Sequence, residues 1–349
     1  MTLAFALADG GSLGSAYHGP AELTPARALT SWLVDPYALA VLAAMCALYL
    51  LGVRRVRLGG GSWPGGRIVA FCMGGVGLAF IATSSFLSVY WPVLFYVRAF
   101  QTVLLVLGVP LFFMLGRPLS LAIAASPRIG SRIQAAVTGR VARVVTFPAV
   151  TALVLVLTPF VLYFSPWFVA GFHSQLVREL TYLVLVLPGL VFFWTLLRID
   201  PVPREYPYLV ALWVTAAEVV GDAALGLAVI ADHTLIAGGY YHALARPWGP
   251  SLASDQVIGG GALWVLGDII GLPFLAAVLI AMIREDESEA RVIDAELDAG
   301  EAANAQAGPV TSPVEAATPE AGQRLWWQDD PRFAGRFAPV DPDSGQASS

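Results

Sequence analysis

The sequence predicts an all-α polytopic membrane protein, folded as a bundle of seven transmembrane helices. Composition, long apolar segments and the distribution of arginine support this prediction. Of the 349 residues, 57% are hydrophobic and only 13% are charged, whereas a soluble domain carries about 25% charged residues. The mean hydropathy is +0.69. The lipid bilayer is therefore the expected environment, and no basic face suggests a nucleic acid partner.

Seven segments are long and apolar enough to be transmembrane helices. A helix needs about 20 mostly apolar residues to cross the hydrocarbon core of a bilayer. Within lipid each segment must satisfy its own backbone hydrogen bonds, so helices are expected throughout. Glycine and proline clusters separate the segments. In chain order the predicted spans are Pro36–Val53, Arg67–Val89, Val93–Leu115, Val145–Phe164, Gln175–Leu197, Tyr208–Ala231 and Gly259–Ile283.

The orientation of the spans follows from arginine. The first, third and fifth connections are rich in arginine, the second and fourth carry none, and the sixth has only Arg246. Because arginine-rich connections stay in the cytoplasm, we predict an N-terminus outside, a C-terminus inside and a location in the bacterial inner membrane. All four histidines then fall on the outer side, either as ordinary loop residues or as a metal-handling surface, since imidazole suits copper and zinc. They are His18, His173, His233 and His242.

Three domains are expected. Residues 1–35 form an extracytoplasmic tail, residues 36–283 the seven-helix domain, and residues 284–349 a cytoplasmic, acidic and largely disordered tail. This last tail begins as a charged helix that continues the seventh span, and disorder is expected over about residues 300–322, where Ala, Pro, Gly and Glu dominate. Trp326-Trp327 marks either a short docking motif or a segment without a role. Gly259-Gly260-Gly261 is expected to form a tight turn at the start of the last helix.

Ionisable residues inside the predicted spans are the strongest functional signal. Each costs about 2.5–3.5 kcal/mol on insertion scales, so such residues are seldom incidental. Helical spacing adds polar neighbours on the same faces. The excess of carboxylates over arginines requires bound protons or a cation. We therefore predict one intramembrane polar cluster, which serves either as interhelical ion pairs or as a cavity for a metal or proton. Its members are Arg98, Gln101, Thr102, Arg178, Glu179, Tyr182, Glu218, Asp222 and Asp268.

The two cysteines form a second, weaker candidate site. Cys46 and Cys72 fall in the first and second spans, beside Met45 and Met73. Thiolate and thioether ligands select Cu(I), so copper is a candidate cofactor there. The same residue types also serve as ordinary apolar packing.

Several motifs, in order along the chain, resemble a known family. They include SWLVDPYALAVLAAMCALYLLGVRR, PVLFYVRAFQTVLLVLGVPLFFMLGRPL and PWGPSLASDQVIGGGALW. Over about residues 29–291 the chain resembles the CtaG-type assembly factors of bacterial haem–copper cytochrome c oxidases. The resemblance implies seven spans, oxidase subunits as partners and a role in delivering copper to the oxidase.

The chain departs from the family pattern where the family presents histidine. The family's third helix usually reads His-Met-x-Gln-His, and here the segment is Arg98-Ala-Phe-Gln101-Thr102. Only Gln101 carries over. Because arginine donates hydrogen bonds and cannot deprotonate, it is a poor metal ligand and a good carboxylate partner.

The fifth and sixth helices depart in the same way. The family's His-Glu-x-x-His is replaced by Arg178-Glu179-Leu-Thr-Tyr182, so only Glu179 carries over, and Asp222 stands where a histidine is expected. We predict that the chain keeps the family fold with a degenerate metal site that binds copper weakly or not at all.

The leading interpretation is a non-enzymatic membrane factor in oxidase biogenesis, acting by copper delivery or as a scaffold or chaperone. Neither a nucleophile–base pair nor a phosphate-binding loop stands out, and no span holds a histidine for haem ligation. The alternative is a proton or small-ion pathway that uses the buried carboxylates. Neither a polar line across the inner half nor an inverted repeat supports that alternative.

Overall fold

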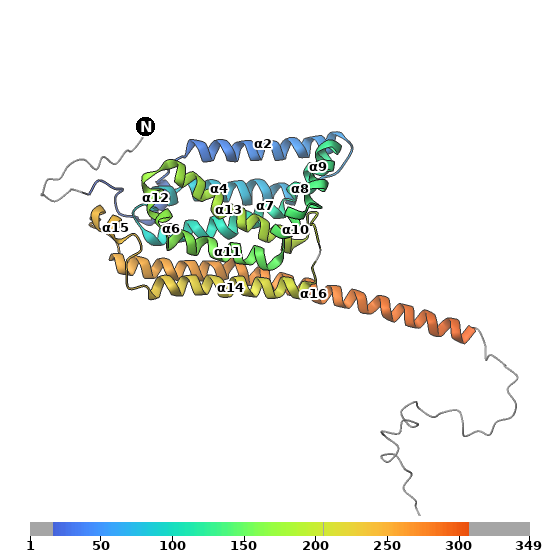
Figure 1. The fold of residues 1–349 in the computed structure, drawn as a ribbon. Helices are drawn as coiled ribbons and strands as arrows, with labels where there is room; N and C mark the ends of the chain where they lie inside the picture. The colour runs from blue at the N-terminus through green and yellow to red at the C-terminus, as the bar shows by residue number, and fades with distance from the viewer. Residues whose placement is uncertain (1–16, 205, 307–349) are drawn as a thin grey trace, which may run out of the picture. The chain divides into compact units, whose positions relative to one another are not determined.

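The computed structural model describes residues 17–204 and 206–306. Within these residues the regular structure is helical, with two π-helical segments and no strand. The chain divides into two units, residues 1–286 and 287–349. The first unit is a helical bundle with α2 (Pro36–Leu58) along one edge and α14 (Tyr208–Ala231) along the opposite edge (Figure 1).

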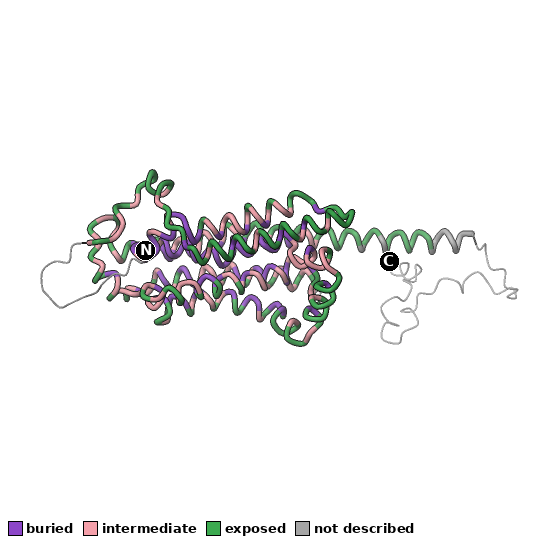
Figure 2. The backbone as a smooth tube through the Cα atoms, turned by 90° about the horizontal axis from the view of Figure 1, so that it is seen from above, coloured by how far each residue is buried: buried purple, intermediate pink, exposed green. Residues whose placement is uncertain are grey.

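In the described part of the chain, six stretches of helix are long and apolar enough to cross a membrane. They correspond to the first, second, third, fifth, sixth and seventh predicted spans. Their outward faces are largely exposed, and the buried residues gather between the helices (Figure 2). The six stretches are Pro36–Leu58, Gly65–Tyr90, Phe95–Ala125, Gln175–Leu197, Tyr208–Ala231 and Leu252–Ala299.

The fourth predicted span is shorter than expected and ends in a bend. Helix α11 (Pro148–Tyr163) turns through 65° into α12 (Pro166–His173). At about 1.5 Å per residue, α11 alone falls short of a hydrocarbon core of about 30 Å. The first helix ends at Tyr163 with Phe164 as its C-cap. Ser165 caps the second helix by accepting from Trp167 N, and Pro166 favours the new helix start. A seventh crossing thus requires that the bent pair act as one span.

The second and third spans are each built from several helical segments. The second combines α3 (Gly65–Val69), η1 (Ala70–Val76), α4 (Gly77–Ser84) and α5 (Phe86–Tyr90). The third combines α6 (Phe95–Val103), η2 (Leu104–Gly108), α7 (Val109–Leu115) and α8 (Pro118–Ala125). The segments η1 and η2 are π-helical, a geometry that is rare and frequent at functional sites.

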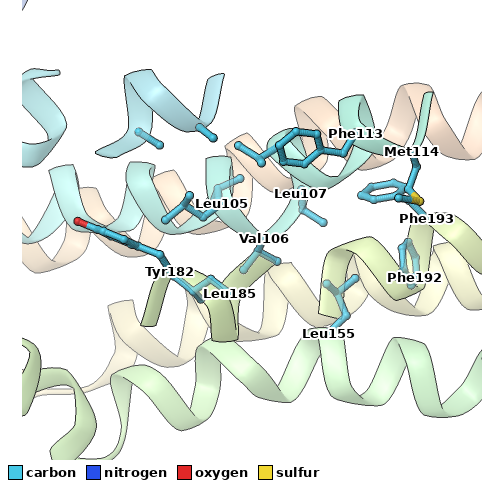
Figure 3. Close-up of a cluster of buried hydrophobic side chains, with 14 of the residues drawn as sticks. Leu105, Val106, Leu107, Phe113, Met114, Leu155, Tyr182, Leu185, Phe192 and Phe193 are labelled. Atoms are coloured by element: carbon cyan, nitrogen blue, oxygen red, sulfur yellow. The ribbon is translucent and has the colours of Figure 1, made fainter. Parts of the chain in front are cut away.

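Glycine allows these two spans to approach closely. A Cβ atom at Gly74 or Gly75 would collide with the ring of Phe112 or Phe113 on α7. The apolar core extends over both sides of the third span. It includes Val106 and Leu107 of η2 together with Leu185 and Phe192 of α13 (Gln175–Leu197) (Figure 3).

Short helices cover the two ends of the bundle. Helices α12 and α15 lie at the same end as the start of α6, and α8, α9 and α10 lie at the other end (Figure 1). The remaining short helices are α1 (Pro25–Thr30), α9 (Pro127–Val137), α10 (Arg140–Val145) and α15 (Gly238–Leu244).

The last helix differs from the prediction at both ends. Helix α16 (Leu252–Gln306) starts before Gly259, so Gly259-Gly260-Gly261 lies inside the helix and the predicted turn is wrong. The reason is close packing, because a Cβ atom at Gly260 would lie 2.8 Å from the Gly226 carbonyl oxygen of α14. The predicted charged helix after the span is present. Residues 300–306 are helical rather than disordered, and Trp326-Trp327 lies outside the described residues.

Candidate intramembrane polar site

The predicted polar residues divide into three groups by their direct contacts. One lies on α6, one at the start of α13, and one between α14 and α16.

The α6 group is a connected hydrogen-bond network. Arg98 Nη1 donates to Gln101 Oε1 at 2.7 Å, and Gln101 Nε2 donates to the Ala82 carbonyl at 2.6 Å. The Thr102 hydroxyl donates to the Arg98 carbonyl and lies 3.0 Å from the Tyr163 hydroxyl. Because a threonine hydroxyl carries one hydrogen, Tyr163 must be the donor in that pair. The predicted shared face of Arg98, Gln101 and Thr102 is confirmed.

The guanidinium of Arg98 is buried without an acidic partner. Its residue is 2% exposed, and among the described residues no carboxylate forms an ion pair with it. It lies over the ring of Trp91 at 4.9 Å, an arrangement that stabilises a cation. Arg98 Nε is buried and has no hydrogen-bond acceptor in the described part of the chain.

The α13 group is an ion-pair cluster with a partner that sequence reasoning missed. Arg178 Nη2 lies 3.3 Å from Asp35 Oδ2 and 3.8 Å from Glu179 Oε1. Asp35 also caps α2 by accepting from Tyr37 N and Ala38 N. An aspartate directly before a proline is a helix-start signal that points to the cap. The pairing with Arg178, however, joins residues 143 positions apart. Tyr182, predicted to belong here, packs into the apolar core (Figure 3).

The environment of Asp35 favours its charged form. Burial acts to raise the pKa of Asp35. The hydrogen bond with Glu179, the two backbone N–H groups and the charge of Arg178 outweigh burial and hold the pKa of Asp35 below its usual value. This cluster is thus a stabilised ion pair. It agrees with the first of the two predicted alternatives, interhelical ion pairs rather than a cavity for a metal or proton.

The third group is a triad of carboxyl groups. Glu218 and Asp222 lie one turn apart on α14, and Asp268 of α16 lies near enough to both for its charge to act on them. Glycines on α16 make the room, since a Cβ atom at Gly267 would collide with Asp222 Oδ2 and one at Gly271 would lie 3.1 Å from Glu218 Oε2. In the described residues no arginine or histidine forms an ion pair with the triad.

A small cavity joins the triad to the α6 group. Asp222 and Thr102 line it, together with Pro159 of α11 and apolar residues that include those of η2 and α16. Its size matches a single water molecule. Thus Thr102 and Asp222 lie around one shared space, while Arg98 turns to Gln101 and Trp91 instead.

A fourth buried polar group, the pair of Asp255 and Arg246, was not predicted. Asp255, at the start of α16, accepts from Phe95 N at 3.1 Å and Tyr96 N at 3.0 Å, so it caps α6. Arg246 Nη2 lies 3.3 Å from its carboxylate. The N-cap residue of α6 itself is Leu94, which has no polar side chain. That missing local cap is the only sequence signal for a capping carboxylate from elsewhere.

The two cysteines lie together. Cys46 Sγ of α2 and Cys72 Sγ of η1 are 3.6 Å apart. Met45 packs against the core beside them, whereas Met73 is 72% exposed and turns outward. The pair supplies two soft ligands, a donor set that fits Cu(I).

The donor set at the family's histidine positions does not fit copper. Arg98 offers only N–H donors, Thr102 is bonded within its own helix and to Tyr163, and Arg178 is paired with Asp35. Over the part of the chain that the structure describes, no group of three or more His, Cys, Asp or Glu residues has the geometry to hold a metal ion.

The helices and the buried charges define a polytopic helical membrane protein with ionisable groups inside its bundle. The chain belongs to the cytochrome c oxidase caa3 assembly factor family, whose model matches residues 47–285. The resemblance drawn from the sequence motifs is confirmed by this match.

Three mycobacterial relatives are similar over most of the chain. An uncharacterized protein of Mycobacterium bovis is 27% identical over 290 residues, 81% of this chain and 44% of that protein. One of Mycobacterium tuberculosis gives the same values. One of Mycobacterium leprae is 28% identical over 278 residues, 77% of this chain and 42% of that protein. The chain thus spans less than half the length of these relatives. No solved structure matches it.

Proposed function

We propose that this protein is a non-enzymatic factor in the biogenesis of a haem–copper cytochrome c oxidase, and that it acts by contact with oxidase subunits. We place it in the bacterial inner membrane with the α12–α15 end of the bundle outside the cytoplasm. The arginine-rich connections at the α8–α10 end support this orientation.

One observation favours action by protein contact over copper transfer at the positions where the family has histidine. Three of the groups that replace histidine are already bonded to other side chains: Arg98 to Gln101, Thr102 to Tyr163, and Arg178 to Asp35. A metal would have to break these bonds and would meet the charge of a guanidinium. A scaffold, by contrast, gains a fixed shape from such bonds.

Oxidase activity in a deletion strain tests the proposal. We expect activity to fall on deletion, to return with the intact gene and to stay low when copper is added to the medium. Rescue by copper would instead favour delivery. Unchanged oxidase activity in the deletion strain would refute a role in biogenesis.

Copper analysis of the purified protein tests the degenerate site separately. We expect no stoichiometric copper that depends on Glu179 or Asp222. A stoichiometric copper that is lost in E179Q or D222N would contradict the proposal. The variant C46S/C72S identifies any copper held instead by the thiol pair, whose sulfur atoms are 3.6 Å apart.

A further inference from the structure

The carboxyl triad of α14 and α16 has a role that the proposed function does not use. Oxidase assembly by contact needs no buried acid, yet Glu218, Asp222 and Asp268 lie together inside the bundle. Glu218 is the eleventh residue of a helix that starts at Tyr208, which places it about 15 Å from that end. The residue is 2% exposed.

The triad lacks positive partners. An isolated ionised carboxylate in a low-dielectric site costs several kcal/mol, so buried charges are normally paired. Here the charged groups that act on Glu218 and Asp222 are the other carboxyls of the triad itself. Within the residues that the structure describes, the neighbouring helices add no positive group to this site. Thr102 of α6 and Pro159 of α11 line the cavity beside Asp222. On α16, glycine packs against Glu218 and Asp222.

Two oxygen atoms show what is missing. Glu218 Oε1 and Asp268 Oδ1 are buried and receive no hydrogen bond from any N–H or hydroxyl of the described residues. These atoms come from different helices. In addition, Glu218 and Asp222 lie one turn apart on the same helix, where two ionised carboxylates would repel each other.

We propose that Glu218, Asp222 and Asp268 form a proton-binding site that holds at least two protons. The protons supply the donors that the triad lacks and leave at most one negative charge inside the bundle. Asp222 is the exchanging member, because it alone of the three lines the cavity shared with Thr102. A water molecule there can pass a proton to or from Asp222.

Labelling with dicyclohexylcarbodiimide tests the site on the intact protein in detergent. This apolar reagent adds to protonated carboxyl groups in apolar surroundings, and mass spectrometry locates the adduct. We expect labelling of the triad at neutral pH, while exposed acids such as Asp294 and Glu296 stay unlabelled. We also expect the labelling to be lost as the pH is raised. Absence of labelling in the triad at neutral pH would overturn the proposal.

Substitutions separate bound protons from a bound metal cation. An amide resembles a protonated carboxyl group, so E218Q and D268N should fold and should each remove part of the infrared band of protonated carboxyl groups. The matched control is E179Q, whose carboxyl belongs to the Arg178 cluster and whose loss should leave labelling of the triad unchanged. A stoichiometric metal ion in the purified protein that is lost in E218Q would overturn the proposal in favour of a metal site.

Discussion

Asp255 and Asp268 lie on the same helix, α16, yet their carboxyl groups have opposite surroundings. Asp255 accepts from two backbone N–H groups of α6 and pairs with Arg246. Asp268 faces two other carboxyl groups and has an oxygen with no donor in the described part of the chain. Asp255 is thus a charge that holds helices together. Asp268 belongs to a triad for which the described residues supply no positive partner, and we propose that bound protons neutralise its charge.

The largest effect is expected from D255N. The change leaves Arg246 buried without its counter-charge and weakens the cap of α6. Removing one partner of a buried ion pair costs about 3–5 kcal/mol. Unfolding in detergent, followed by helix content, should show a loss of this size. Equal losses of stability in D255N and D268N would contradict the proposed difference between the two aspartates.

A smaller effect is expected from G267A, which tests the glycine face beneath the triad. The added Cβ atom collides with the Asp222 carboxyl, and overpacking of this kind costs about 1–3 kcal/mol. The matched control is G261A on the same helix, where nothing lies within 4 Å of the added atom. Equal stability of the two variants would mean that the carboxyls do not pack against α16 as described.

The Asp35 cluster predicts a weaker effect that depends on pH. Since the folded state holds the pKa of Asp35 below its usual value of 3.8, the stabilisation is complete above that value. It is lost as the pH falls through the lower pKa of the folded state. We expect a contribution on the order of 1 kcal/mol. Unfolding measured from neutral to acidic pH should show an acid-dependent loss in the wild type that is reduced in D35N.

The smallest effect is expected from D268N and E218Q. If the triad is protonated, each change replaces one neutral group with another of similar shape, and stability should change by less than about 1 kcal/mol. A loss comparable with that of D255N, measured in the same unfolding assay, would show that the triad carries charge held by a partner.

The sequence predicts the helices well and the pairing of their polar groups poorly. Apolar length and helical spacing are local properties, so the shared face of Arg98, Gln101 and Thr102 is predicted correctly. Which helix supplies a partner is not local. Asp35 pairs with Arg178, and Asp255 bonds to Phe95, across more than a hundred residues. In neither case does the local sequence of one partner indicate the other.

Close helix packing was misread for a related reason. Three consecutive glycines favour a turn when only neighbours along the chain are considered. In the structure Gly260 packs against Gly226 of another helix. The absence of a side chain therefore allows the two helices to approach closely, and the backbone stays helical. The end of the fourth span at Phe164 was predicted within one residue, but the helix α12 that follows it and its 65° angle to α11 were not.

The cap that Asp255 gives to α6 has a consequence for how the chain is built. The third apolar segment is synthesised long before Asp255. The amide groups of Phe95 and Tyr96 therefore cannot donate to the Asp255 carboxylate until the final helix has been inserted. Until then the amino-terminal end of that segment is held by water or by lipid headgroups at the surface. Completion of the bundle is therefore coupled to insertion of its last helix. Chains that end before residue 252 lack the carboxylate that caps α6 at the start of the third span.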